Sequence, residues 1–183
     1  MKYQELEGLR YPIGEFLKPE TISPQQIEEW IEVIANLPDK LIAITQDLTT
    51  EQLNWSYRPV GWSIKQIVHH FADSHMNSFI RFKLALTEDN PTIRPYKEIY
   101  WAELLDGKED DLSDSLLLIK SLHNKWVRLL RSLSTEDLKR TFVHPEHGQH
   151  FSLDENIGIY AWHCRHHMEH IKIALLFKGQ FTG

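Results

Sequence analysis

The sequence predicts an all-α protein built as a helical bundle, and three observations support this fold class. Four long segments carry apolar residues at the spacing of an amphipathic helix. Several of these segments open with a residue type that caps helix N-termini. The chain has 183 residues and 42% hydrophobic content, which suffices for one core but hardly for two. We therefore expect a single domain over residues 1–183, with four helices packed around one core.

The first long helix is expected to begin at Pro24, because Ser23 is a favourable N-cap and proline is favoured at the first helical position. Its apolar residues recur at helical spacing and are Ile27, Trp30, Ile31 and Ile34. Pro38 lacks a backbone N–H, so we expect it to break or kink this helix before the segment "DKLIAITQDL" continues it.

The second helix is expected from Ser63 to about Leu86, because Ser63 and Gln66 have the spacing of a capping box. Pro91 and Pro95 then predict a loop. The segment "EIYWAELL" can form a short helix inside that connection.

The third long helix is expected from about Ser113 to Leu133. Its apolar side consists of Leu117, Ile119, Leu122, Trp126, Leu129 and Leu130. The segment "STEDLKR" predicts one further capped turn, and "TFVHPEHGQHFSL" alternates around a glycine and predicts a small hairpin. The last helix is expected to begin at Ser152, with Glu155 as capping partner, and to end near Lys178 with Gly179 as its stop.

Composition excludes several classes of function. A net charge of −6 without a basic stripe disfavours binding to nucleic acid. No apolar run approaches the roughly 20 residues that span a bilayer, and the N-terminus lacks the layout of a secretory signal, so no membrane partner is expected. The single cysteine, Cys164, rules out an intrachain disulfide. We therefore expect a cytoplasmic protein.

Eleven histidines are the unusual feature of the composition, and four of them fall in "WHCRHHMEH". Residues four apart lie on one line of a helix, which pairs His163 with His167 and His166 with His170. Such a pair can bind one divalent ion from two adjacent turns. His163 and His170 are separated by roughly 10 Å of helical rise, so a third ligand is expected from another helix.

The segment "IVHHFADSH" can supply that ligand. His70, Ser74, Asn77 and Arg81 form a narrow polar stripe beside the apolar face of the second helix. His69 points away from both faces, so His70 is the preferred ligand. Periodicity favours His163 with His167 over His166 with His170 only slightly, and both pairs stay open at this point.

Simpler roles are expected for other residues of these types. His123, His144, His147 and His150 are interpreted as surface or turn residues. Cys164 is expected to pack as a small apolar residue, and Trp126 and Trp162 are expected in the core. Asp73, Glu169 and Tyr160 lie within a turn of the candidate ligands and can orient a histidine. A bundle whose histidines bind no metal is the alternative to all of these roles.

Three stretches carry a resemblance to a known family. They are "YPIGEF", "GWSIKQIVHHFADSHMNSFIRFKLALTEDNPTIRPY" and "YAWHCRHHMEHI". The chain resembles the YfiT-type branch of the DinB-like family of metal-dependent hydrolases over about residues 11–177. The resemblance implies a four-helix bundle of up-down-down-up order, a homodimer, and one divalent ion, nickel or zinc, held by three histidines. Carried over by motif position, these histidines are His70, His163 and His167.

The resemblance also implies a range of functions. Relatives include thiol S-transferases that use bacillithiol or mycothiol, and the hydrolase label often rests on the metal site alone. We therefore expect a metal-dependent enzyme acting on a small molecule, either a hydrolase or a low-molecular-weight-thiol S-transferase. Asn77 and Arg81 are the candidate substrate-binding residues, and Arg81 can equally form an interhelical salt bridge. A non-catalytic metal-binding module, with His166 or His75 as a fourth ligand, is the alternative.

Overall fold

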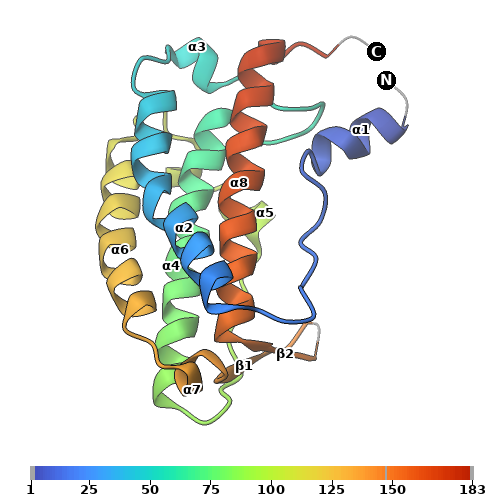
Figure 1. Cartoon of the computed structure of the whole chain (residues 1–183). Helices are drawn as coiled ribbons and strands as arrows, with labels where there is room; N and C mark the ends of the chain where they lie inside the picture. The colour runs from blue at the N-terminus through green and yellow to red at the C-terminus, as the bar shows by residue number, and fades with distance from the viewer. Residues whose placement is uncertain (1–2, 147, 182–183) are drawn as a thin grey trace.

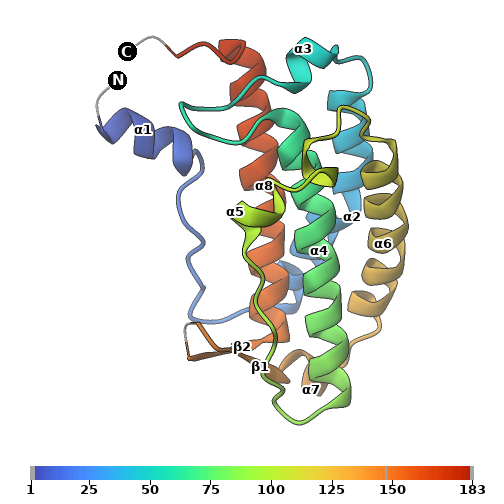
Figure 2. The same ribbon diagram turned by 180° about the vertical axis from the view of Figure 1, so that it is seen from behind.

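Four long helices lie side by side in the computed structural model (Figure 1), which describes residues 3–146 and 148–181, excluding the side chains of residues 3–6. They are α2 (Pro24–Thr45), α4 (Ile64–Thr87), α6 (Ser113–Arg131) and α8 (Leu153–Phe177). Helices α2 and α8 run in one direction and α4 and α6 in the other, as both views show (Figures 1 and 2). The predicted bundle and its up-down-down-up order are confirmed.

Side-chain caps begin α2 and α4 where the sequence predicts them. The Ser23 hydroxyl accepts a hydrogen bond from the backbone N–H of Gln26. Ser63 and Gln66 form the reciprocal capping box at the start of α4. These bonds satisfy N–H groups that have no partner inside the helix.

Helix α2 continues without interruption through Pro38, so of the predicted break or kink, the break is wrong. Proline removes the hydrogen bond that the carbonyl oxygen of Ile34, four residues earlier, would accept. Here that oxygen accepts a hydrogen bond from Nδ1 of His123 on α6, at 2.7 Å. A side chain from the neighbouring helix thus replaces the missing backbone donor.

Shorter elements connect and flank the four helices. They are α1 (Tyr3–Arg10), α3 (Thr50–Leu53), α5 (Glu98–Trp101), the 3₁₀ helix η1 (Asp106–Lys108), α7 (Thr135–Leu138), and the strands β1 (Thr141–His144) and β2 (Gln149–Ser152). The two strands pair antiparallel, which confirms the small hairpin. The short helix in the α4–α6 connection and the capped turn α7 are confirmed too. Helices α1 and α3 were not anticipated.

The rotation of α6 corrects two assignments made from the sequence. Ile119 faces the core and is fully buried. Leu117 lies two residues earlier, about 200° around the helix, so it points outward and is 65% exposed. His123 lies one turn after Ile119 on the same face, and it is buried rather than at the surface.

The ends of α8 differ in how well they were predicted. Ser152 is the N-cap residue, but Glu155 is not its capping partner, because the Glu155 carboxylate pairs with Lys18 at 2.6 Å. The Asp154 carboxylate instead accepts the backbone N–H of Glu155 at 2.8 Å. At the other end, Lys178 and Gly179 have φ values of 52° and 65°, and this left-handed turn ends the helix near the predicted position.

The connection between α4 and α6 runs along the bundle beside α4 and α8 (Figure 2). It brings α5 and the residues before it to the face where these two antiparallel helices meet. Buried side chains from all four helices form one continuous cluster. Within the described part of the chain, no helix combines the length and the apolar character that a membrane span requires.

Candidate metal centre

Three histidines from α4 and α8 converge on one point. The ligand nitrogens of His70, His163 and His167 all lie within 4.8 Å of one another. The Nε2 atoms of His70 and His163 are 3.1 Å apart. His70 and His167 are buried and His163 is partly buried. The structure therefore brings together the three residues that the family resemblance implied.

His69 has a separate role from its neighbour His70. Its Nε2 atom bonds the carbonyl oxygen of Glu109 at 3.0 Å, and its Nδ1 bonds the Ser115 hydroxyl at 2.8 Å. Both partners lie on the α6 side of α4, away from α8. The choice of His70 over His69 from helical geometry agrees with this placement.

Burial keeps the three rings in the form that binds metal. Desolvation, with a further contribution from His166, lowers the pKa of His70 to about 3. Desolvation also lowers the pKa of His163 and of His167 well below the usual value, and neighbouring histidines add to the effect. At neutral pH each ring is therefore uncharged and keeps a nitrogen lone pair, as metal coordination requires.

The donor set fits a divalent cation. Two imidazole nitrogens bound at about 2.1 Å to one tetrahedral ion lie roughly 3.4 Å apart. The separation of 3.1 Å between the Nε2 atoms of His70 and His163 is close to that value. Three neutral nitrogen ligands also leave a coordination position open for a substrate or water.

Two further histidines bond the opposite nitrogens of the α8 pair. Nδ1 of His163 lies 3.1 Å from Nε2 of His75, and Nδ1 of His167 lies 3.2 Å from Nδ1 of His170. His75 thus contacts the side of His163 that points away from His70, where it cannot serve as a fourth ligand to the same centre. Sequence reasoning considered His75 only as a ligand and His170 only as half of a pair.

A second histidine group shares His167 with the first. His166, His167 and His170 also place three ligand nitrogens within 4.8 Å of one another. In this group, Nε2 of His170 bonds the carbonyl oxygen of Arg10 at 3.1 Å, which leaves only Nδ1 as a lone-pair donor. The geometry thus leaves both pairs on α8, His163 with His167 and His166 with His170, as candidate ligands. Which group can bind an ion depends on which nitrogen of His167 carries the proton.

Of the residues expected to orient the ligands, Tyr160 lines the same pocket but hydrogen-bonds Ser74 rather than a candidate ligand. The Tyr160 hydroxyl donates to the carbonyl oxygen of Ser74 at 3.1 Å. Glu169 pairs with Lys172 at 3.0 Å. Burial, with a contribution from Asp106, raises the pKa of Asp73 to about 6, but no hydrogen bond joins its side chain to a ligand among the described residues. The side chains that do hydrogen-bond the α8 candidates are His75 and His170.

A pocket of about 390 Å³ opens over the three histidines. Its wall includes Tyr96 from the α4–α6 connection and Trp162 from α8. Trp162 is partly exposed and stacks on His166 at 4.4 Å, so its predicted place in the core is wrong. Trp126, in contrast, is fully buried as expected.

Cationic side chains dominate the charge of this pocket. Its described lining contains the arginines Arg10, Arg58 and Arg81, with Glu98 as the one carboxylate. Arg81 forms no salt bridge within the described chain, and its Nε atom is buried without a hydrogen-bond partner. The structural role considered for Arg81, an interhelical ion pair, is therefore not observed.

Asn77 does not line the histidine pocket. It lies in an adjoining cavity of about 680 Å³, to which Arg81 and Tyr96 also contribute. Its amide nitrogen donates to the carbonyl oxygen of Asp73 one turn earlier, at 2.8 Å. Of the two substrate-binding candidates, the structure places only Arg81 beside the histidines.

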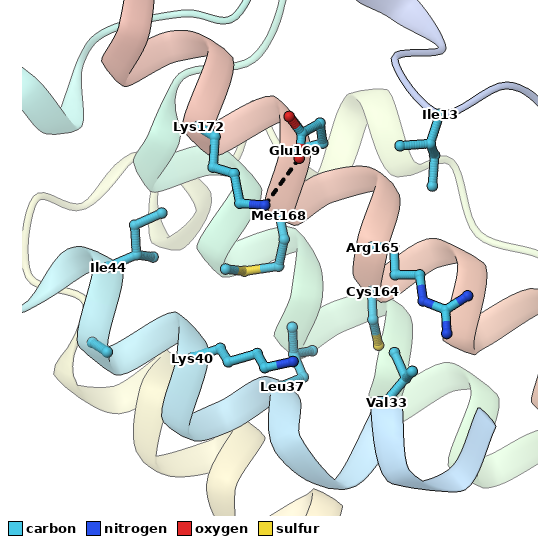
Figure 3. Close-up of a pocket in the computed structure, with 11 residues that line it drawn as sticks. Ile13, Val33, Leu37, Lys40, Ile44, Cys164, Arg165, Met168, Glu169 and Lys172 are labelled. Atoms are coloured by element: carbon cyan, nitrogen blue, oxygen red, sulfur yellow. Dashed lines mark hydrogen bonds and ion pairs between the residues drawn. The ribbon is translucent and has the colours of Figure 1, made fainter. Parts of the chain in front are cut away.

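Cys164 lies on the opposite side of α8, in a groove of about 610 Å³ against α2. Figure 3 shows its sulfur pointing toward α2, near Val33 and Leu37. Burial raises the pKa of the thiol, which keeps it protonated. The prediction that Cys164 packs as a small apolar residue is confirmed.

Fold and site together define a class of protein: a helical bundle with a histidine cluster, suited to a metal ion, between two antiparallel helices. Residues 34–171 match the DinB superfamily, and the chain belongs to this family.

Relatives of known name and structure agree with this assignment. The chain is 53% identical over 166 residues to proteins of Bacillus cereus and Bacillus thuringiensis, each named "Putative metal-dependent hydrolase", covering 91% of this chain and 95% of each relative. It also matches the solved structure of YfiT from Bacillus subtilis, with a TM-score of 0.91 and 46% identity, over 95% of this chain and 99% of YfiT. YfiT is described there as a probable metal-dependent hydrolase with an unusual four-helix bundle topology.

Proposed function

We propose that this protein is a metal-dependent hydrolase of small molecules, in which His70, His163 and His167 bind one divalent ion, zinc or nickel. One observation carries the proposal. Three uncharged imidazoles from two helices, two of them buried and one partly buried, bring their nitrogens within 4.8 Å of one another in the wall of a pocket. The 3.1 Å between the Nε2 atoms of His70 and His163 is close to the separation of two nitrogens bound to one tetrahedral ion.

Hydrogen bonding favours this group over His166, His167 and His170. Nδ1 of His163 bonds His75, so the atom left to bind metal is Nε2, which faces His70. The same argument applies to His167 when its Nδ1–H donates to Nδ1 of His170. The free nitrogen of His163 then faces His70 on α4, and that of His167 belongs to the same group of three ligand nitrogens.

A divalent ion held by His70, His163 and His167 would supply Lewis-acid chemistry, acidifying water and polarising a substrate carbonyl. The chain's own residues bind and orient the substrate. Arg81 offers an unpaired guanidinium at the pocket wall, where it can bind a carboxylate or phosphate. Burial raises the pKa of Tyr96, so its phenol stays protonated and can donate a hydrogen bond. The proposed substrate is a small anion.

Thiol S-transfer is the second candidate, and the composition of the pocket favours it in one respect. Glu98 is the one carboxylate of its described lining, so few groups can act as general base for attack by water. In S-transfer, the thiol releases its proton to solvent, its sulfur bonds an electrophilic carbon, and the leaving group departs with the bonding electrons. A cation stabilises the thiolate that this step requires.

Metal content of untagged protein tests the site. We expect close to one zinc or nickel per chain in the wild type and a loss of most of it in His70→Ala. His69→Ala is the matched control, because it removes a buried imidazole from the same helix whose nitrogens bond Ser115 and Glu109. Equal metal content in all three proteins would contradict the proposed ligand set.

Activity assays then separate the candidate reactions. Metal-loaded protein is compared on ester and amide substrates and on a small thiol, such as bacillithiol, with an alkyl halide. Arg81→Gln is expected to raise KM for a carboxylate-bearing substrate about tenfold or more and to leave a neutral analogue unaffected. Background rates on every substrate class, with metal fully loaded, would favour a non-catalytic metal-binding module.

We also propose that the protein acts as a homodimer, as the family resemblance implies. Light scattering at micromolar concentration is expected to give twice the chain mass of 21.6 kDa. A monomeric mass under these conditions would contradict the dimer and leave the metal site untouched.

A further inference from the structure

Two chains of hydrogen bonds lead from backbone carbonyl groups to the histidines of α8. The longer chain starts at the carbonyl oxygen of Ile34, which lies 2.7 Å from Nδ1 of His123. Nε2 of His123 lies 2.7 Å from Nδ1 of His75, and Nε2 of His75 lies 3.1 Å from Nδ1 of His163. His75 and His123 are almost completely buried, so they lie beyond the reach of bulk water.

The direction of every bond in this chain follows from its first member. A carbonyl oxygen can only accept, so Nδ1 of His123 carries a proton. A neutral imidazole has one N–H, so Nε2 of His123 must accept from Nδ1 of His75. By the same step, Nε2 of His75 accepts from Nδ1 of His163. The remaining nitrogen of His163, Nε2, therefore has a lone pair and no proton.

Burial keeps the rings of this chain neutral. Desolvation lowers the pKa of His123 to about 4, although the hydrogen bond to Ile34 opposes this effect. His75 and His123 are almost completely buried, and within the described chain their hydrogen-bond partners are a carbonyl oxygen and other imidazoles, so a charged ring would have no carboxylate beside it.

Pro38 makes the Ile34 carbonyl available. In an ordinary helix this oxygen accepts the N–H of the residue four positions later, but proline has none. His123 therefore bonds an oxygen that has no competing backbone donor. A proline in α2 thus fixes the protonation of a histidine on α8 through two intermediate rings.

The shorter chain has the same logic. The carbonyl oxygen of Arg10 accepts from Nε2 of His170 at 3.1 Å, and the Tyr57 ring stacks on His170 at 3.7 Å between ring centres. Nδ1 of His170 is then an acceptor, and it faces Nδ1 of His167 at 3.2 Å. When His167 donates this bond, its Nε2 atom is left with the lone pair.

We propose that His75, His123 and His170 are positioning residues that hold His163 and His167 in the Nδ1–H tautomer, each with Nε2 ready to bind the ion. The two chains end at Ile34 and Arg10, so the tautomers are set by the fold before any metal arrives. The effect on metal binding rests on the proposed function, whereas the tautomers themselves do not.

Nuclear magnetic resonance of metal-free protein with ¹⁵N-labelled histidine tests the tautomers directly. Two-bond proton–nitrogen spectra at pH 7 distinguish the nitrogen that carries hydrogen in each ring. We expect Nδ1–H for His75, His123, His163 and His167, and Nε2–H for His170. Nε2–H at His163 would overturn the longer chain, and Nε2–H at His167 would overturn the shorter one and favour the group formed with His166 and His170.

Reciprocal variants test what each chain does, with circular dichroism and a thermal melt to verify folding. His75→Phe removes the acceptor for His163, and His170→Phe removes the acceptor for His167. Each is expected to change the ring spectrum of its own partner, to leave that of the other α8 histidine unchanged, and to weaken zinc binding 10- to 100-fold. His75→Gln can accept from His163 and donate to His123, so it is expected to restore much of the affinity.

The outcomes separate this inference from the proposed metal site. Unchanged zinc affinity and an unchanged His163 spectrum in folded His75→Phe would overturn the longer chain, even if His70→Ala abolishes metal binding. Wild-type protein that binds no zinc but shows the expected tautomers would contradict the proposed function and retain the hydrogen-bond chains. Should His75→Phe fail to fold, the wild-type ring spectrum and the zinc affinity of His75→Gln still test the longer chain.

Discussion

Acid should destabilise the metal-free protein through its buried histidines, and His123 allows the effect to be worked out for one residue. Its pKa is lowered from 6.5 to about 4 by burial. Between these two values the unfolded chain binds a proton that the folded chain does not, so stability falls as the pH is lowered from 6.5 toward 4. Well above pH 6.5 the group is neutral in both states and its contribution to stability no longer changes with pH.

The size of the effect follows from the two pKa values. For a group with pKa 6.5 unfolded and about 4 folded, lowering the pH from 7 to 5 reduces the free energy of unfolding by about 2 kcal/mol. Other histidines with lowered pKa, such as His70 and His170, add to the total loss in the wild type. The variant His123→Gln should lose about 2 kcal/mol less over this pH interval than the wild type does.

Urea unfolding followed by circular dichroism, at pH 7 and pH 5 with a chelator present, measures both losses. The chelator matters because a bound ion would keep its ligands neutral and add its own pH dependence. His150→Gln is the control, because His150 is exposed on β2 and should leave the difference between the two pH values as in the wild type. An equal loss of stability in His123→Gln and the wild type would refute the reasoning.

Two further predictions concern packing and metal. In Gly158→Ala the new Cβ would lie 2.8 Å from Trp30 Cη2 and 3.0 Å from Phe16 Cζ. We expect a net destabilisation on the order of 1–2 kcal/mol in urea unfolding, despite a gain of about 1 kcal/mol in helix propensity. A variant more stable than the wild type would contradict this packing. Zinc at about 100 times its Kd is expected to stabilise the wild type by about 2.7 kcal/mol, measured by calorimetry, and to have little effect on His70→Ala; equal stabilisation of both proteins would place the ion elsewhere.

The long helices were predictable because their signals are local. A capping residue such as Ser63 and the apolar periodicity that follows it lie within a few turns of one another, and the structure preserves both. Pro38 shows where such reasoning fails. The local rule correctly removes one backbone hydrogen bond, but the replacement comes from His123, 85 positions further along the chain.

The histidine site, too, was predictable only in part. Helical geometry selected His70 on α4 but left two histidine pairs open on α8, and the family resemblance supplied the choice of His163 with His167. The partners of their other nitrogens depend on which groups α2, α6 and α1 bring to the site, and α1 was not anticipated at all. His123 in particular was assigned to the surface, because its burial depends on the rotation of α6 about its axis.

Buried histidines that do not reach the pocket centre need a physical reason to be there. His75 and His123 lower stability in acid, and apolar residues of similar volume would fill the core without that cost. An apolar side chain cannot accept the N–H of His163. It also cannot connect His163, through further hydrogen bonds, to the carbonyl oxygen of Ile34 on α2. A neutral imidazole is suited to this position because it accepts at one nitrogen and donates at the other. Through the rings of His123 and His75, the carbonyl group of Ile34 thus determines which nitrogen of His163 has the free lone pair.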